Sequence, residues 1–111
     1  LDVLVLCSQK ILPLTLVECY PIGVINIKDN KELDQKIIAI PFQEPALNQY
    51  KDVKELPLHT FEEIRHFFQV YKNLENKLVT VEDICGKKEA ERIIEKSIKE
   101  YEIKRNNGDF K

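Results

Sequence analysis

Two aspartates and a lysine gather where a polar stretch separates two apolar segments. Asp29, Asp34 and Lys36 lie within or beside the polar stretch 28–35, which is flanked by segments rich in Val and Ile. Two carboxylates with a lysine close by could hold a hard divalent cation and a phosphate, and loops anchored by strands are frequent functional sites. A charged hairpin loop is equally typical of a solvated surface, so both interpretations stay open at this point.

Asp2 is a second unusual carboxylate. It stands between Leu1 and the apolar run 3–5. An aspartate in such a segment lies either at the exposed edge of a strand or in a buried position. A buried carboxylate needs a cation or several hydrogen-bond donors.

Tyr71 and Lys72 lie near the end of a predicted helix. Tyr71 falls on the apolar side of that helix, where packing with the hydroxyl at the rim is the ordinary role. Lys72 would ordinarily be a solvated surface residue.

The elements that must position these residues are strands followed by helices. Short runs rich in Val and Ile suit a pleated sheet, and they predict strands over residues 3–6, 14–19, 23–27 and 36–40, with a polar loop over 28–35. After Pro57 the apolar spacing becomes helical. Thr60 and Glu63 form a capping-box pattern that predicts a helix start at Thr60.

The apolar positions along each helix predict its buried side. For the first helix they are Phe61, Ile64, Phe67, Phe68, Tyr71 and Leu74; for the second, over 87–105, they are Ala90, Ile93, Ile94, Ile98 and Tyr101. A short strand is expected over 78–81. Residues 1–41 and 60–105 together predict a single α+β domain.

Composition narrows the function. The 111 residues have a net charge of −2 and are 43% hydrophobic, which argues against a nucleic-acid binder, and no apolar run is long enough to cross a membrane. Cys7, Cys19 and Cys85 are too scattered for a zinc site or a disulfide scaffold. The chain contains no Met and begins inside a strand-like run, so we expect it to be part of a longer protein.

Taken in order, these segments resemble the family I soluble inorganic pyrophosphatases, with plant-type members most similar around Tyr71 and Lys72. The resemblance runs from Leu1 to about Tyr101 and rests on residues 1–5 (LDVLV), 21–23 (PIG), 29 with 34–41 (DQKIIAIP), 54–57 (KELP) and 66–72 (HFFQVYK). It implies a partial OB-like β-barrel of the pyrophosphatase type, with two C-terminal helices packed outside.

The resemblance also implies roles for individual residues. Asp2 matches the last aspartate of the family signature D-x-D-P-x-D, and Asp29 and Asp34 match two further acidic metal ligands. The residues that match phosphate-binding groups are Lys36, Tyr71 and Lys72. The implied cofactor is Mg²⁺. This chain departs from the family at Glu32, where Gly is common, so the local backbone of the loop is in question.

The reaction implied is hydrolysis of pyrophosphate to two phosphates by a metal-activated water. The upstream signature aspartates would precede Leu1, so no catalytic residue is assigned within this chain and the chain alone is expected to lack turnover. The resemblance further implies a cytoplasmic hydrolase of phosphate metabolism and a homo-oligomer. Two alternatives remain, a catalytically dead homologue and a non-catalytic OB-like binding module.

The resemblance makes a geometric prediction. Asp2, Asp29 and Asp34 should converge, and their repulsion should raise at least one pKa. Lys36, Tyr71 and Lys72 should point into the same cavity, while Lys31 and Glu32 should face solvent.

Overall fold

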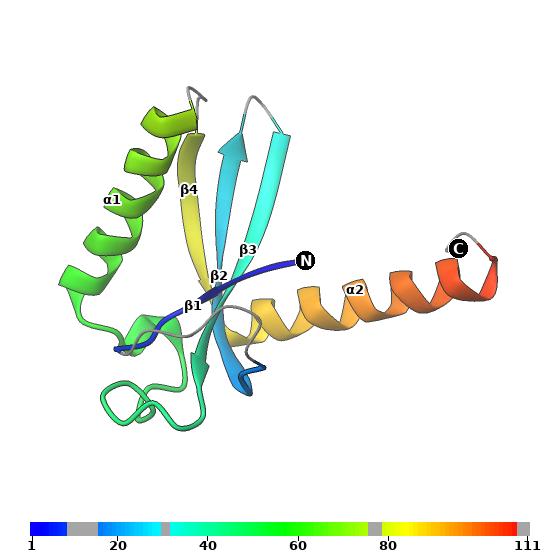
Figure 1. Cartoon of the computed structure of the whole chain (residues 1–111), viewed down its shortest axis with the longest axis horizontal. Coiled ribbons are helices and arrows are strands. Elements are labelled where there is room, and N and C mark those ends of the chain that lie inside the picture. Colours follow the sequence, from blue (N-terminus) through cyan, green and yellow to red (C-terminus); the bar gives the residue numbers. More distant parts are fainter. Residues whose placement is uncertain (9–15, 30–31, 76–78, 109–111) are drawn as a thin grey trace.

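A mixed four-stranded sheet lies between two helices (Figure 1). The computed structural model describes residues 1–8, 16–29, 32–75 and 79–108, and at positions 29, 71–75 and 79 it describes the backbone alone. The elements in chain order are β1 (Asp2–Val5), β2 (Cys19–Asp29), β3 (Glu32–Pro41), the 3₁₀ turn η1 (Val53–Glu55), α1 (Leu58–Glu75), β4 (Val79–Gly86) and α2 (Lys87–Asn106).

The strand order in the sheet is β1-β3-β2-β4. β1 pairs parallel with β3, whereas β2 pairs antiparallel with both β3 and β4. Within the described residues the sheet is open, with β1 and β4 at its edges. This is compatible with the predicted partial barrel. The predicted α+β class is confirmed.

The predicted strand limits need three corrections. The loop expected over 28–35 is wrong, because β2 continues to Asp29 and β3 begins at Glu32. Asp34 and Lys36 therefore lie within a paired strand. Residues 16–18 of the strand expected over 14–19 are irregular, and positions 14 and 15 lie outside the described residues. The strand expected over 78–81 is longer than predicted and ends at Gly86.

Side chains of β3 alternate between two hydrophobic layers, as strand geometry requires. Ile38 and Ile40 face α1, whereas Ile37 faces α2. The layer toward α1 contains Ile22, Ile25, Ile27, Ile38, Ile40, Val53, Leu56, Ile64 and Phe68. The smaller layer toward α2 contains Val24, Ile37, Ala90 and Ile93. Each helix covers one face of the sheet (Figure 1).

A β-bulge in β2 adds one residue to the larger layer. The pairing of β2 with β3 shifts between Pro21 and Gly23, so Ile22 can join Ile25 in the same layer although their spacing is odd. A Cβ on Gly23 would lie 2.7 Å from a methyl carbon of Val53. The glycine thereby lets η1 pack directly on β2.

The carboxylate of Asp52 caps two helical segments at one corner of the fold. It accepts hydrogen bonds from the backbone N–H of Lys54, at the start of η1, and of Lys87, at the start of α2. These backbone bonds, the one from Lys54 foremost, lower the pKa of Asp52. Glu55 accepts from the Asp52 N–H and completes a capping box. A Cβ on Gly86 would lie 3.0 Å from the Asp52 carboxylate.

The capping box predicted at Thr60 is therefore wrong. α1 begins at Leu58, directly after Pro57, so Thr60 lies inside the first turn. Its backbone N–H donates to the carbonyl of Pro57. The described capping box lies instead at Asp52 and Glu55, where the pattern D-x-x-E consists of the N-cap and the three residues of the 3₁₀ turn η1.

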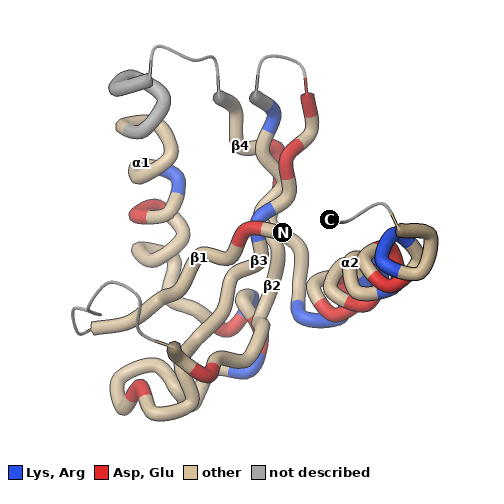
Figure 2. Tube along the Cα trace, turned by 45° about the vertical axis from the view of Figure 1, so that its right-hand side comes forward, with Lys and Arg blue, Asp and Glu red and all other residues tan. Residues whose placement is uncertain are grey.

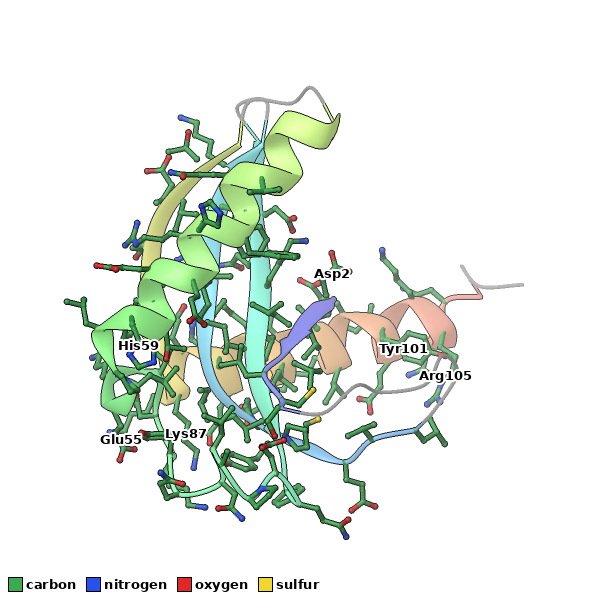
Figure 3. All side chains as sticks on the ribbon, turned by 60° about the vertical axis from the view of Figure 1, so that its left-hand side comes forward. Asp2, Glu55, His59, Lys87, Tyr101 and Arg105 are labelled. Carbon is green, nitrogen blue, oxygen red and sulfur yellow. The ribbon has the colours of Figure 1, made fainter. Side chains whose placement is uncertain are left out.

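The buried side predicted for α2 is confirmed only in its first half. Ala90 and Ile93 are buried, but Ile98 and Tyr101 are 52% and 54% exposed. The physical reason is that α2 runs past the end of the sheet (Figure 1), with Tyr101 toward its far end (Figure 3). In the described part of the chain, neither helix has the length and apolar character needed to cross a membrane.

Glu44 brings a carboxylate into a buried position, 4% exposed. It accepts hydrogen bonds from the N–H and hydroxyl of Ser8 and from the N–H of Ala46. These bonds connect the segment that follows β1 to the turn that follows β3, and they satisfy a charge that would otherwise be costly to bury. They also lower the pKa of Glu44, chiefly through the Ser8 hydroxyl.

We expect Phe68→Ala to lower the free energy of unfolding by about 3–5 kcal/mol, because it leaves a cavity in the larger layer. Phe67→Ala is the matched control, since Phe67 is 52% exposed and Phe68 only 4%. The control should cost about 1 kcal/mol, mostly from loss of its edge-to-face ring contact with Phe68. Urea unfolding followed by circular dichroism measures both, and equal losses would contradict the packing described here.

We expect Glu44→Gln to lower the urea midpoint at neutral pH, because an amide cannot accept all three hydrogen bonds as a carboxylate does. A lowered folded pKa means that the carboxylate stabilises the fold above its ordinary value of 4.5 and loses this effect as pH falls through the folded value. The gap between wild type and variant should therefore close in acid. Glu62→Gln, at an exposed position of α1, should show no such pH-dependent gap.

Candidate functional site

The ammonium group of Lys36 lies between two carboxylates in the half of β3 that is next to the β2–β3 hairpin. Lys36 Nζ lies 2.9 Å from Asp2 Oδ2 and 3.0 Å from Asp34 Oδ2. The Lys36 side chain is 24% exposed, Asp34 45% and Asp2 70%. We call these three residues the Asp2–Lys36–Asp34 cluster. Figure 2 shows acidic and basic positions side by side where β1 meets β3.

Strand register explains why residues so far apart in sequence meet here. Asp2 is the direct partner of Lys36 in the parallel pairing of β1 with β3. Asp34 precedes Lys36 by two residues on the same strand, so both side chains face the same way. That face is the α1 side, because Ile38 continues the same row into the larger hydrophobic layer. Figure 3 shows Asp2 on β1 beside β3.

The ionisation of the cluster follows from these contacts. The hydrogen bond and the positive charge of Lys36 hold the pKa of Asp2 below its usual value. Burial opposes the charge of Lys36, yet the hydrogen bonds to Asp2 and Asp34 outweigh it and raise the pKa of Lys36. Asp2 is therefore not a carboxyl whose pKa is raised by repulsion, because the ammonium of Lys36 lies beside it. The expectation that at least one of the three aspartates has a raised pKa stays a prediction.

Asp29 is only partly located by the structure. It ends β2, and its backbone pairs with Glu32 and Val79. Asp34 pairs with Ile27, so Asp29 lies two residue pairs farther along the hairpin than Asp34. The side chain of Asp29 is outside the described residues. Among the side chains that are described, no group of three or more His, Cys, Asp or Glu could hold a metal ion.

Tyr71 and Lys72 have backbone positions in the C-terminal part of α1, and their side chains lie outside the described residues. α1 covers the face of the sheet that carries the cluster. Asp2 and Lys36 line a groove of about 280 Å³ with Phe67 and Phe68 of α1. Tyr71 follows these phenylalanines by one helical turn.

The predicted solvent exposure of Glu32 is confirmed, and Lys31 lies outside the described residues.

A polar ladder on the opposite face of the sheet was not predicted from the sequence. The Gln35 side-chain amide donates to Asn26 at 2.9 Å, and the Asn26 amide donates to Asp83 at 2.8 Å. The ladder crosses β3, β2 and β4 and fixes the residue between Asp34 and Lys36. The available signal was Asn26, a polar residue inside an apolar strand, but its partners depend on cross-strand register.

The donor set of the cluster suits a hard divalent cation. The two carboxylates offer oxygen ligands, which Mg²⁺ and Ca²⁺ prefer. They already meet at a single positive group, so they lie within reach of one cation. Lys36 adds a donor for an anion such as phosphate. The arrangement therefore offers ligand types that suit a metal ion and a donor type that suits a phosphate group.

Comparison with known proteins identifies the family that the chain resembles. The family model described as inorganic pyrophosphatase matches residues 1–102. The chain is 37% identical to soluble inorganic pyrophosphatase 2 of Chlamydomonas reinhardtii over 92% of this chain and 53% of that protein. It is 40% identical to soluble inorganic pyrophosphatase 1 of Arabidopsis thaliana over 91% of this chain and 48% of that protein.

The fold of the chain is also similar to those of solved inorganic pyrophosphatases. A solved inorganic pyrophosphatase of Helicobacter pylori superposes with a TM-score of 0.83 at 37% identity, covering 90% of this chain and 61% of that one. A second, from Neisseria gonorrhoeae, gives a TM-score of 0.78 at 30% identity, covering 90% and 59%. The chain thus spans about half the length of the two plant and algal relatives and somewhat more of the bacterial ones. The predicted resemblance is confirmed: the chain belongs to the inorganic pyrophosphatase family.

Proposed function

We propose that the protein carrying these residues hydrolyses inorganic pyrophosphate to two phosphates and that it requires Mg²⁺. The observation that supports this most directly is the meeting of Asp2 and Asp34 at Lys36. A solvated hairpin loop gives no reason for its aspartate to share a partner with a residue of another strand. The names of the relatives add the substrate, which the geometry alone leaves open.

Asp2 and Asp34 would hold the metal, and Asp29 would add a third carboxylate from the same hairpin. When bound, such a metal lowers the pKa of a water molecule and neutralises phosphate oxygens. The contribution of the chain is to fix its ligands on paired strands. The pairing of β1 with β3 fixes the position of Asp2 beside Lys36. The hydrogen bond from Gln35 to Asn26 fixes the part of β3 that carries Asp34.

Lys36, Tyr71 and Lys72 would bind the oxygens of the substrate. Pyrophosphate carries several negative charges, so its binding needs hydrogen-bond donors and cations on the side away from the carboxylates. Lys36 lines the groove beside α1, and the backbone of the helix continues to Tyr71 and Lys72 beyond the two phenylalanines that line this groove.

The alternatives have less support. A nucleic-acid-binding OB-like module would present aromatic side chains together on its sheet, whereas the most exposed described aromatics, Phe42, Phe67 and Tyr101, lie on three different segments. A catalytically dead homologue would share the geometry and is separated by activity. Cytoplasmic location and homo-oligomerisation belong to this proposal through the family resemblance.

In the whole protein, we expect Asp34→Asn to lower Mg²⁺-dependent release of phosphate from pyrophosphate by at least about 100-fold, because a metal ligand loses its charge. Glu32→Gln removes an equal charge from an exposed position on the same strand and should change the rate little. Chelation of the metal should abolish the wild-type rate. A whole protein that releases no phosphate with Mg²⁺ would instead support the dead-homologue alternative.

We expect Tyr71→Phe to leave the thermal midpoint nearly unchanged, since the ring is retained. It should lower kcat/KM for pyrophosphate about tenfold through loss of one hydrogen bond to a charged oxygen. Tyr101→Phe, at a half-exposed position on α2, is the control. Wild-type kinetics in Tyr71→Phe would show that Tyr71 only packs.

A further inference from the structure

The ammonium of Lys36 lies between the carboxylates of Asp2 and Asp34, a position that a metal ion sharing the same two oxygens would also need. This ammonium bonds one oxygen of each carboxylate, at 2.9 Å and 3.0 Å. Lys36 is also the least exposed of the three side chains, so a half-buried positive charge is compensated by two negative ones. The positive charge of Lys36 therefore compensates part of the negative charge of Asp2 and Asp34 when no metal ion is bound.

A divalent cation and the ammonium cannot both keep this place. Mg²⁺ binds carboxylate oxygens at about 2.1 Å, so an ion shared by the same two oxygens would lie within a few ångströms of Nζ. Repulsion between like charges at that distance is strong where water is partly excluded. The carboxylates would keep the divalent ion, because it carries twice the charge at a shorter distance.

The fold gives the displaced ammonium a place to move. The groove of about 280 Å³ lined by Asp2, Lys36, Phe67 and Phe68 opens beside the cluster on the α1 side. Lys36 itself lines this groove, and the four-carbon stem of a lysine is flexible. An ammonium that has lost its carboxylates there needs a new anionic partner.

We propose that Lys36 is an internal counter-ion that a divalent cation displaces, and that the displaced ammonium becomes a binding group for phosphate. This inference rests on the proposed function and adds an order to it: the metal binds first and thereby makes the lysine available to the substrate. Before metal binding, the same lysine keeps the two carboxylates together.

The first test is calorimetric titration of the full chain with Mn²⁺ alone. Lys36→Met removes the competitor and should bind Mn²⁺ about three- to tenfold more tightly than wild type, the range expected for two partly exposed ion pairs. Lys28→Met is the matched control, because Lys28 lies on the same hairpin but pairs with Leu33, whose side chain faces away from the cluster. Affinity in Lys36→Met that equals or falls below the control would overturn the inference.

The second test needs no variant that must fold. In the wild-type chain labelled with ¹⁵N-lysine, proton exchange of the Lys36 ammonium should be slow without metal and faster once Mg²⁺ saturates the site. Exchange that stays slow at saturation means that the ion pairs persist, which overturns the displacement.

The two hypotheses fail in different ways. If Mn²⁺ binds to wild type and is lost in Asp34→Asn, but Lys36→Met gains nothing over Lys28→Met, only the counter-ion inference is wrong. Absence of Mn²⁺ binding in wild type and in every variant overturns both the metal site and the inference.

Discussion

The alternation of side chains along β3 is the constraint on which the rest of the structure depends. β3 has a hydrogen-bonded neighbour on each side, so its residues can project only toward α1 or toward α2. One row contains Asp34, Lys36, Ile38 and Ile40; the other contains Gln35 and Ile37. The row toward α1 is charged near the hairpin and apolar toward Pro41, and the row toward α2 begins with the exposed Leu33, followed by Gln35 and then Ile37. The same strand therefore builds both hydrophobic layers at one end and presents charge at the other.

The position of Lys36 on this strand explains how a charge is tolerated next to the core. Its neighbour across the sheet is Ile25, which is fully buried, so the lysine stem can lie against apolar surface while its head group reaches outward. Asp2 meets the head group because β1 lies parallel beside β3. Pairing of this kind also favours the correct register, since a slip of one residue would turn Asp2 to the other face.

Much of the fold was predictable from local patterns, and the exceptions have physical reasons. Runs of Val and Ile predicted the core of β2 and β3, and apolar spacing predicted both helices. The prediction that Ile98 and Tyr101 are buried was wrong, because apolar spacing shows which side of a helix is apolar but not where the sheet ends. The start of α1 was wrong because Pro57 allows a helix to begin before Thr60. The proximity of Asp2 to Asp34 was predicted only from the family resemblance. No local sequence pattern specifies that Asp2 pairs in parallel with Lys36, 34 residues away.

The corner at Asp52 has a mechanical consequence. One carboxylate bonds the first backbone N–H of α2 and the N–H of Lys54 in η1, and a Cβ on Gly86 would crowd this carboxylate at 3.0 Å. Only two residues, Leu56 and Pro57, separate η1 from the start of α1. A rotation of α2 about its own start would therefore pull on the segment from which α1 departs. The starts of the two helices, which lie on opposite faces of the sheet, are thus connected through the hydrogen bonds of Asp52.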